Sequence, residues 1–230
     1  MPEEPRRDAK MNGFLTGRVI DRAFARGLLA ALAIGFGCAQ EPPAIKQDPL
    51  LDDGSMPTFG VTTVSSSGLH GQIYFIREGA VGLPNFKKMK PVGSIYTNSL
   101  HVPPRDFKEG FPGITDRFEW FAIDYKGRFW IEQPGKYKFA LVSDDGSKLY
   151  IDNKILIDND GLHSTLAMYG TTKLERGIHD IRVSYYQGPG NALSLILAVM
   201  RPDQKEYFVF DMRNFRPPKD LLDQPGEKRP

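Results

Sequence analysis

Hydrophobic and polar residues alternate along much of the central and C-terminal chain, with the two-residue period of a β-strand. In "KYKFAL", Tyr137, Phe139 and Leu141 point to one face, and the residues between them point to the other. "HDIRVSYY", residues 179–186, alternates in the same way. "ALSLILAVM", residues 192–200, is apolar on both faces, as expected for a central strand that is covered on both sides.

Nine short segments share this strand character, because they are rich in β-branched and aromatic residues and bounded by Gly, Pro, Asn or Asp. No segment shows a sustained helical period. Many short strands at close spacing predict an all-β fold, an antiparallel two-sheet β-sandwich that is jelly-roll-like. The stretch from Pro84 to Pro112 is rich in Pro, Gly and Lys, and its structure stays open. The predicted strands are residues 71–76, 117–124, 127–132, 136–143, 148–152, 154–158, 179–186, 192–200 and 206–212.

The length of 230 residues suits one domain of ordinary size with tails. We expect the folded domain to span residues 68–215. Residues 38–67 are rich in Pro, Gly, Ser and Asp without an apolar period, which predicts a flexible tether. Residues 216–230 contain several prolines and predict a flexible tail.

Residues 1–37 have the pattern of a signal peptide. Three arginines precede an uncharged run at residues 27–37, which is too short for a transmembrane helix. The stretch before this run is long for a signal, so either Met1 or Met11 fits as the start. The pattern predicts export from the cytoplasm.

The only cysteine, Cys38, directly follows the apolar run. "IGFGCAQ" resembles a bacterial lipobox, in which the cysteine becomes the lipid-modified first residue, although Gly35 stands where that motif prefers Leu. Such a lipoprotein would be anchored to the membrane of the bacterial cell envelope. Cleavage after Ala39 is the alternative, since Gly37 and Ala39 are both small, and it would give a secreted protein.

Charge is distributed unevenly along the chain. Residues 1–37 carry six Lys or Arg and four Asp or Glu, which accounts for the formal net charge of +2. The remaining body is formally neutral. A neutral body argues against nucleic-acid binding, which needs a basic surface to displace counterions from phosphates.

The stretch "LVSDDGSKLYIDNKILIDNDGLH", residues 141–163, places five aspartates within seventeen positions. If successive strands alternate in direction, the Asp144–Asp145 turn shares one end of the sandwich with Asn159 and Asp160, and Asp152 lies at the other end. "QGPGNA", residues 187–192, is expected to form a hairpin that can join the first group. These aspartates either form turns between strands or hold a cation.

Four motifs occur together: "G-x-Y-x-F" at residues 135–139, "DDG" at 144–146, "LYID" at 149–152 and "G-x-H-x-I-x-V-x-Y" at 177–185. Together they resemble the PA-fourteen family. This β-sandwich module was first described in a bacterial toxin protective antigen, and it occurs in glycosidases, fungal flocculins and surface adhesins. The similarity covers about residues 68–201, most of the predicted domain.

The resemblance implies that calcium mediates glycan binding. In the adhesins of this family, two adjacent aspartates joined by a cis peptide hold the ion, and an asparagine from a late loop and sugar hydroxyls complete its ligands. The matching residues are Asp144, Asp145 and Asn191. Calcium takes six to eight oxygen ligands in irregular geometry, so carboxylates, an amide oxygen and hydroxyls all suit it. The expected partner is a glycan or a cell-envelope polysaccharide.

Five further residues near this end are candidates for ligand contact. Tyr186 alternates away from Tyr185, which predicts an exposed ring that can stack on a sugar. The complete set is Asn159, Asp160, His163, Tyr186 and Gln187.

Other functions remain open. The late loop lacks the tryptophan that is usual in the calcium-binding members, and members that bind no sugar keep "DDG" because Asp caps a hairpin and Gly supplies positive φ. The alternative is therefore a structural or protein-interaction component of the envelope, which binds envelope proteins rather than metal or sugar.

Catalysis is not expected, although an accessory domain of a hydrolase is a third hypothesis. The two adjacent aspartates share one tight turn, whereas an acid and a base must flank the scissile bond at ~5–9 Å. The chain also contains no nucleophile or phosphate-binding motif.

Overall fold

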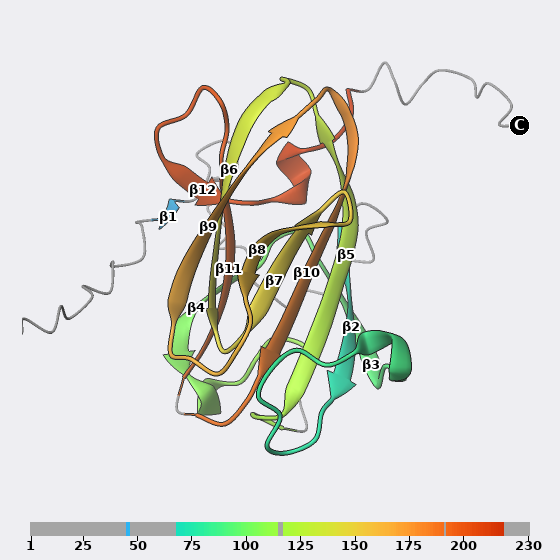
Figure 1. Ribbon diagram of the computed structural model, residues 1–230, viewed down its shortest axis with the longest axis vertical. Coiled ribbons are helices and arrows are strands. Elements are labelled where there is room, and N and C mark those ends of the chain that lie inside the picture. Colours follow the sequence, from blue (N-terminus) through green and yellow to red (C-terminus); the bar gives the residue numbers. More distant parts are fainter. Residues whose placement is uncertain (1–44, 47–67, 115–116, 191, 219–230) are drawn as a thin grey trace, which may run out of the picture. The chain divides into compact units, whose positions relative to one another are not determined.

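The computed structural model describes residues 45–46, 68–114, 117–190 and 192–218, which all lie in one compact unit, residues 40–230. Two six-stranded sheets pack face to face (Figure 1). The all-β sandwich predicted from strand periodicity is confirmed. No helix among the described residues is long and apolar enough to cross a membrane.

The first sheet is antiparallel except for its first pair, in which β1 runs parallel to β12. Its strands, in spatial order, are β1 (Ile45–Lys46), β12 (Tyr207–Val209), β11 (Ala192–Met200), β6 (Gly135–Asp144) and β9 (Leu166–Leu174), and β4 (His101–Asp106) also pairs with β11.

The second sheet is antiparallel throughout. Its order is β3 (Gly93–Thr97), β2 (Leu69–Phe75), β5 (Phe121–Ile131), β10 (Gly177–Gln187), β7 (Ser147–Ile151) and β8 (Lys154–Asn159). Short 3₁₀ turns occur at Phe86–Lys88, Phe107–Glu109 and Met212–Asn214.

The core lies between the sheets and is filled by the inward-facing residues of alternating strands. On β5 and β6 these include Tyr125, Phe129 and Phe139, each at most 1% exposed. Burying a side chain of this size contributes roughly 1.5–3 kcal/mol. β11, the segment that is apolar on both faces, is an inner strand and is buried from Leu193 to Val199.

Several elements differ from the sequence expectation. Residues 117–124 and 127–132 do not form two strands, because β5 runs without a break through Gly127. A Cβ at Gly127 would lie 3.0 Å from Leu69, so the glycine permits close packing instead of forming a turn. β9 was not predicted, since it is an edge strand with side chains exposed on both faces. Ile45–Lys46, placed in the predicted tether, forms β1.

The connections between strands also differ in one respect that matters for the site. The turn after β6 and the loop after β10 were expected to close hairpins. In both cases the chain instead passes from one sheet to the other, because β6 and β11 belong to the first sheet while β7 and β10 belong to the second. The predicted signal peptide, Cys38 and Asn191 lie outside the described residues.

Candidate cation and ligand site

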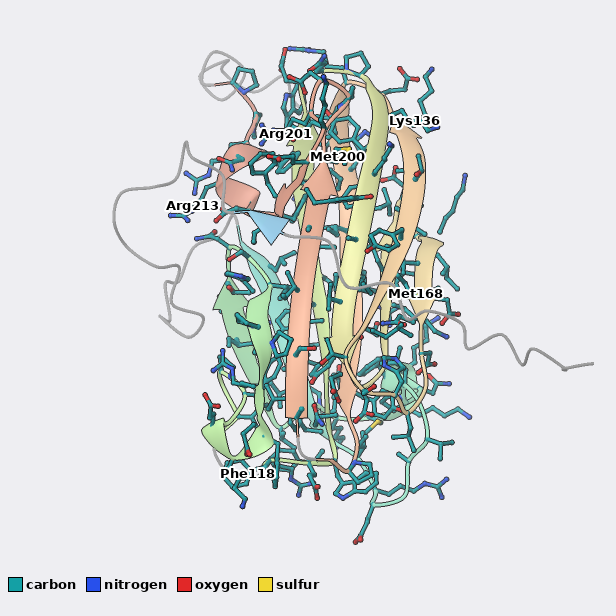
Figure 2. All side chains as sticks on the ribbon, turned by 90° about the vertical axis from the view of Figure 1, so that its left-hand side faces the viewer. Phe118, Lys136, Met168, Met200, Arg201 and Arg213 are labelled. Carbon is teal, nitrogen blue, oxygen red and sulfur yellow. The ribbon has the colours of Figure 1, made fainter. Side chains whose placement is uncertain are left out.

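One end of the sandwich collects the connections that follow β2, β4, β6, β8 and β10. This end is at the bottom of Figure 1, and Figure 2 labels Phe118 there and Lys136 at the opposite end. As predicted, Asp144, Asp145 and Asn159 share this end. Asp152 lies at the other end, where its Oδ2 atom is 2.7 Å from Nδ1 of His179.

Asp144 ends β6, and Asp145 begins the crossing to β7. The peptide bond between them is cis, as the family resemblance implies. Both residues are buried, with 7% of Asp144 and 4% of Asp145 exposed. The two carboxylates therefore lie side by side in sequence at a site that is largely closed to water.

Asp145 is held by three donors. Its Oδ1 atom accepts a hydrogen bond from the backbone N–H of His163 at 3.2 Å. Its Oδ2 atom accepts bonds from the backbone N–H of Gly188 at 2.8 Å and from Nε2 of Gln187 at 3.4 Å. Asp145 thus ties together the loops that follow β8 and β10.

Asp144 has fewer partners on its carboxylate. Oδ2 accepts a bond from the Thr165 hydroxyl at 3.3 Å, and the backbone N–H of Thr165 also donates to this carboxylate. Its backbone carbonyl oxygen accepts a bond from the Tyr185 hydroxyl at 2.7 Å, which anchors the backbone to the core. Hydrogen-bond donors therefore compensate the Asp144 charge less than they compensate the Asp145 charge.

Burial raises the pKa of both carboxyl groups above the usual aspartate range. The neighbouring Asp145 charge raises the pKa of Asp144 further. Among the described residues, no lysine or arginine forms an ion pair with Asp144 or Asp145. The site therefore concentrates negative charge without a lysine or arginine partner among the described residues, although the nearby His163 ring acts to lower the pKa of both carboxyl groups.

Two of the predicted ligand residues are engaged in internal contacts. Asn159 is buried, and its Nδ2 atom donates to Oγ of Ser143 at 3.0 Å and to the carbonyl of Leu166 at 3.2 Å. Asp160 accepts a bond from the Leu83 N–H at 2.8 Å and pairs with Lys148 at 3.1 Å. Both residues fix the loops around the aspartate pair.

His163 and Gln187 support Asp145. Both ring nitrogens of His163 lie 2.9 Å from carbonyl oxygens of its own loop, those of Ser164 and Asn159. His163 therefore contacts Asp145 through its backbone N–H, while its ring bonds only to the backbone of its own loop. Gln187 is fully buried and donates to Asp145 and to the carbonyl of Ala192, so it positions the carboxylate.

The prediction of an exposed Tyr186 is wrong. Its side chain is fully buried in a second apolar cluster with Tyr74 and Phe86, which lies on the outer face of the second sheet. The alternation of Tyr185 and Tyr186 was assigned correctly, but the loop after β2 covers the outer face at this point. Tyr186 therefore cannot provide a platform for a sugar ring.

Gly146 in the "DDG" motif has a role that the sequence did not reveal. It is not among the glycines with positive φ, so the turn does not require it for that reason. A Cβ at this position would lie 2.3 Å from Cε1 of Tyr186 and 2.8 Å from the backbone nitrogen of Gly161. Glycine is needed because the turn packs directly against the tyrosine ring and the next loop.

Aromatic residues from an earlier loop also reach this end. Phe118, Glu119 and Trp120 line a hollow of about 400 Å³. Glu119 accepts a bond from the Gly190 N–H at 3.1 Å, and the N–H of Trp120 donates to the Gln187 carbonyl at 2.9 Å. The loop that precedes β5 is thereby attached to the loop that carries the predicted ligand Asn191.

Within the described residues there is no cluster of three or more His, Cys, Asp or Glu side chains suited to a metal. The oxygen donors that the structure places here are the carboxylates of Asp144 and Asp145. Such a donor set fits a hard cation that accepts amide and hydroxyl oxygens, such as calcium, and it does not fit zinc, which prefers Cys and His.

The PA14 domain model matches residues 65–210 of the chain, well over half of its length. The chain belongs to the PA14 domain family. Among curated proteins none matches the chain.

Solved structures show the same PA14 fold. The PA14 domain of the MpAFP antifreeze protein is 17% identical, with a TM-score of 0.53, covering 66% of this chain and 92% of that one. The PA14 sugar-binding domain from an RTX adhesin is 15% identical, with a TM-score of 0.53, covering 65% and 97%. An anti-sigma factor domain-containing protein is 23% identical, with a TM-score of 0.51 and 71% of this chain covered, and the match spans only 51% of its length.

Proposed function

We propose that this PA14 domain binds carbohydrate at the end that carries Asp144 and Asp145, with calcium bound between the two carboxylates and the sugar. One observation carries the proposal. The carboxylates of Asp144 and Asp145 are adjacent and buried, the charge of Asp145 disfavours the charge of Asp144, and neither carboxylate has a lysine or arginine partner among the described residues. Buried charges are normally paired or bind a metal.

A bound divalent cation would compensate both carboxylates. The Asp145 carboxylate is fixed by three hydrogen bonds, while the Asp144 carboxylate accepts bonds from Thr165 alone. Asn191, which the family resemblance names as a ligand, follows Gly190, and that loop is attached to Asp145 through the N–H of Gly188. Calcium in this position would supply open coordination sites for sugar hydroxyls.

A structural relative also supports the proposed sugar binding. The domain from the RTX adhesin, which shares the fold, is described as sugar-binding. In this chain, Phe118 and Trp120 line the hollow beside the late loop, and Phe118 is 46% exposed. These aromatic side chains offer apolar surface for the C–H face of a sugar ring, in place of the tryptophan that the late loop lacks.

We also propose that the mature protein is exported and attached to the bacterial cell envelope through lipid on Cys38. Support comes from the apolar run before Cys38 and its lipobox-like surroundings. Mass spectrometry of the mature N-terminus distinguishes a diacylated Cys38 from a chain that begins after Ala39.

A glycan array probed with calcium and with chelator tests the function. We expect glycan binding in calcium, loss of binding in chelator, and loss of binding in Asp144→Asn. Asp152→Asn is the matched control, because Asp152 lies at the opposite end, and it should bind like the parent. Binding that is unaffected by chelator and by Asp144→Asn would contradict the proposed mechanism.

Two observations favour the alternative of an envelope protein that binds neither metal nor sugar. Residues 187–197 contain no tryptophan, and the structure buries Tyr186, the preferred stacking residue. In that case an envelope protein captured by this domain would remain bound in chelator and in the presence of competing sugars.

A further inference from the structure

A groove of about 890 Å³ lies at the end of the second sheet that is remote from the aspartate pair. Lys126, Arg128 and Trp130 of β5 line it, together with Arg216 and Ile178. Ile178 pairs with Trp130, and nine residue steps along β10, about 30 Å, separate Ile178 from Gln187 at the aspartate end. The groove is therefore a separate surface.

Strand register places aromatic and cationic residues next to one another along this groove. Tyr96 pairs with His70, and His70 pairs with Lys126. The rings of Tyr96 and His70 are stacked, with centroids 4.5 Å apart and an interplanar angle of 19°. Arg128 and Trp130 follow on the same face of β5 at steps of about 7 Å.

The Trp130 side chain is also held in place. Its Nε1–H donates to Oε2 of Glu132 at 2.8 Å, and the Arg176 guanidinium lies 5.1 Å from the ring centroid. Ile178, directly across from Trp130, is 62% exposed. Rings that are fixed before binding lose little conformational freedom when a ligand arrives.

The charge of the groove is positive. Its lining carries the cations Lys126, Arg128 and Arg216 against one acid, Asp180. Lys126 pairs with buried Asp124 at 2.9 Å, yet 57% of its side chain stays exposed. The Arg128 guanidinium makes no ion pair or hydrogen bond with any other residue that the structure describes.

We propose that this groove binds an acidic polysaccharide, with Lys126, Arg128 and Arg216 contacting carboxylates and with Tyr96 and Trp130 contacting the sugar rings. Arginine binds carboxylates through two parallel hydrogen bonds, and flat aromatic faces suit the apolar faces of sugar rings. The assignment is independent of the calcium site, which lies at the other end of β10.

An oligogalacturonate and its fully methyl-esterified form are suitable probes, used with the purified protein in chelator so that calcium plays no part. We expect the acid form to bind, the ester form to bind at least tenfold more weakly, and rising salt to weaken the acid form. Arg128→Gln should weaken binding about tenfold, which corresponds to one charge-assisted hydrogen bond. Tyr96→Ala should weaken it as well.

Lys136→Gln is the matched control, since it removes one exposed positive charge from β6 at the same end of the domain, and it should leave binding within about twofold of the parent. Asp144→Asn should bind like the parent, which separates this site from the calcium site. Equal binding of acid and ester, equal losses in Lys136→Gln and Arg128→Gln, or tighter binding of a single-stranded oligonucleotide would each overturn the proposal.

Discussion

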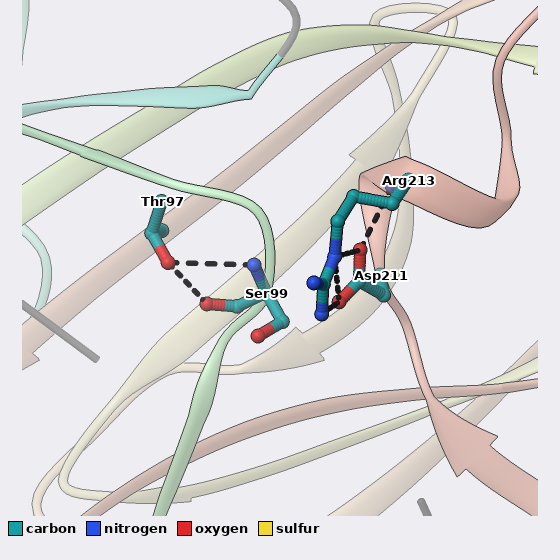
Figure 3. Close-up of polar contacts among 4 residues, drawn as sticks. All are labelled: Thr97, Ser99, Asp211 and Arg213. Carbon is teal, nitrogen blue, oxygen red and sulfur yellow. Dashed lines mark hydrogen bonds and ion pairs between the residues drawn. The ribbon is translucent and has the colours of Figure 1, made fainter. Parts of the chain in front are cut away.

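Four aspartates are buried among the described residues, and they fall into two pairs that the chain treats differently. Asp124 accepts bonds from Arg182 at 2.6 Å and Ser184 at 2.8 Å, and it pairs with Lys126 at 2.9 Å. Asp211 is held by the guanidinium of Arg213 at 2.9 Å (Figure 3). Each of these two carboxylates has a cation supplied by the fold.

The other pair, Asp144 and Asp145, has hydrogen-bond donors but no lysine or arginine among the described residues. Burying an uncompensated carboxylate is costly, so the absence here of the cations found at Asp124 and Asp211 supports the proposed binding of an external cation. The comparison supports the proposal that Asp144 and Asp145 bind a ligand, whereas the ion pairs of Asp124 and Asp211 hold parts of the sandwich together.

The largest effect is expected for Asp124→Ala. This change leaves Arg182 and Lys126 without their shared partner and should lower the free energy of unfolding by about 3 kcal/mol. Denaturant unfolding in chelator measures it, and the calcium affinity of the folded variant should not change. A loss below about 1 kcal/mol would show that the cations at Asp124 contribute little, and the contrast between the two pairs would weaken.

The next largest effect is a loss of stability when the packing around the Asp144–Asp145 turn is disturbed. Gly146→Ala places a Cβ against the Tyr186 ring and the backbone of Gly161, and overpacking of this kind costs about 1–3 kcal/mol. Gly190→Ala is the control, because a Cβ there meets no atom within 4 Å. Thermal unfolding compares the two variants. If both behave like the parent, the turn is not held by the packing that the structure shows.

Asp144→Asn is expected to change the free energy of unfolding by a smaller amount, and toward greater stability rather than less. Removal of the charge relieves the repulsion with Asp145, so metal-free stability should stay within about 1 kcal/mol of the parent or rise. Denaturant titrations in chelator and in calcium give both values. The parent should gain stability in calcium, by ~2.7 kcal/mol at roughly 100 times Kd, and the variant should not. A large loss in chelator would mean that the charge is stabilising without a metal.

The smallest effect is the pH dependence of the metal-free protein. Because burial raises the pKa of both carboxyl groups, the folded state binds more protons than the unfolded state above the ordinary value of 3.8. The free energy of unfolding should therefore fall as pH rises from 3.8 through the raised values, and calcium affinity should fall as pH drops through the same range.

His179 provides an internal check on that pH profile. Although its burial lowers the pKa, the hydrogen bonds to Asp152 and Glu175 outweigh that effect, and the pKa of His179 is raised above 6.5. Its contribution to stability is fully present below pH 6.5 and is lost as pH rises through the folded-state pKa. His179→Gln should remove this part of the profile and leave the acidic part intact. A free energy of unfolding in the parent that does not fall as pH rises above 3.8 would contradict the raised aspartate pKa values.

Strand alternation was sufficient to predict the sandwich and the end at which Asp144, Asp145 and Asn159 meet, because both follow from local periodicity and strand direction. The same reasoning missed β9, whose edge position leaves residues such as Met168 and Tyr169 exposed on both faces.

The environment of individual side chains could not be predicted in this way. Tyr186 faces outward from its strand as expected, but a loop distant in sequence covers it. Gly146 looks like an ordinary turn glycine, and its contact with Tyr186 depends on tertiary packing. The support of Asp145 by Gly188 and the approach of Trp120 to this end arise from loops whose paths carry no periodic pattern.

Calcium binding at Asp144 and Asp145 can be measured by calorimetric titration of calcium into the metal-free protein at neutral pH. We expect one ion to bind per chain with a Kd of roughly 10⁻³ M or tighter, and we expect Asp144→Asn and Asp145→Asn to abolish this binding and Asp152→Asn to retain it. No binding heat up to about 10 mM calcium, or equal binding by the Asp144→Asn variant, would contradict this expectation.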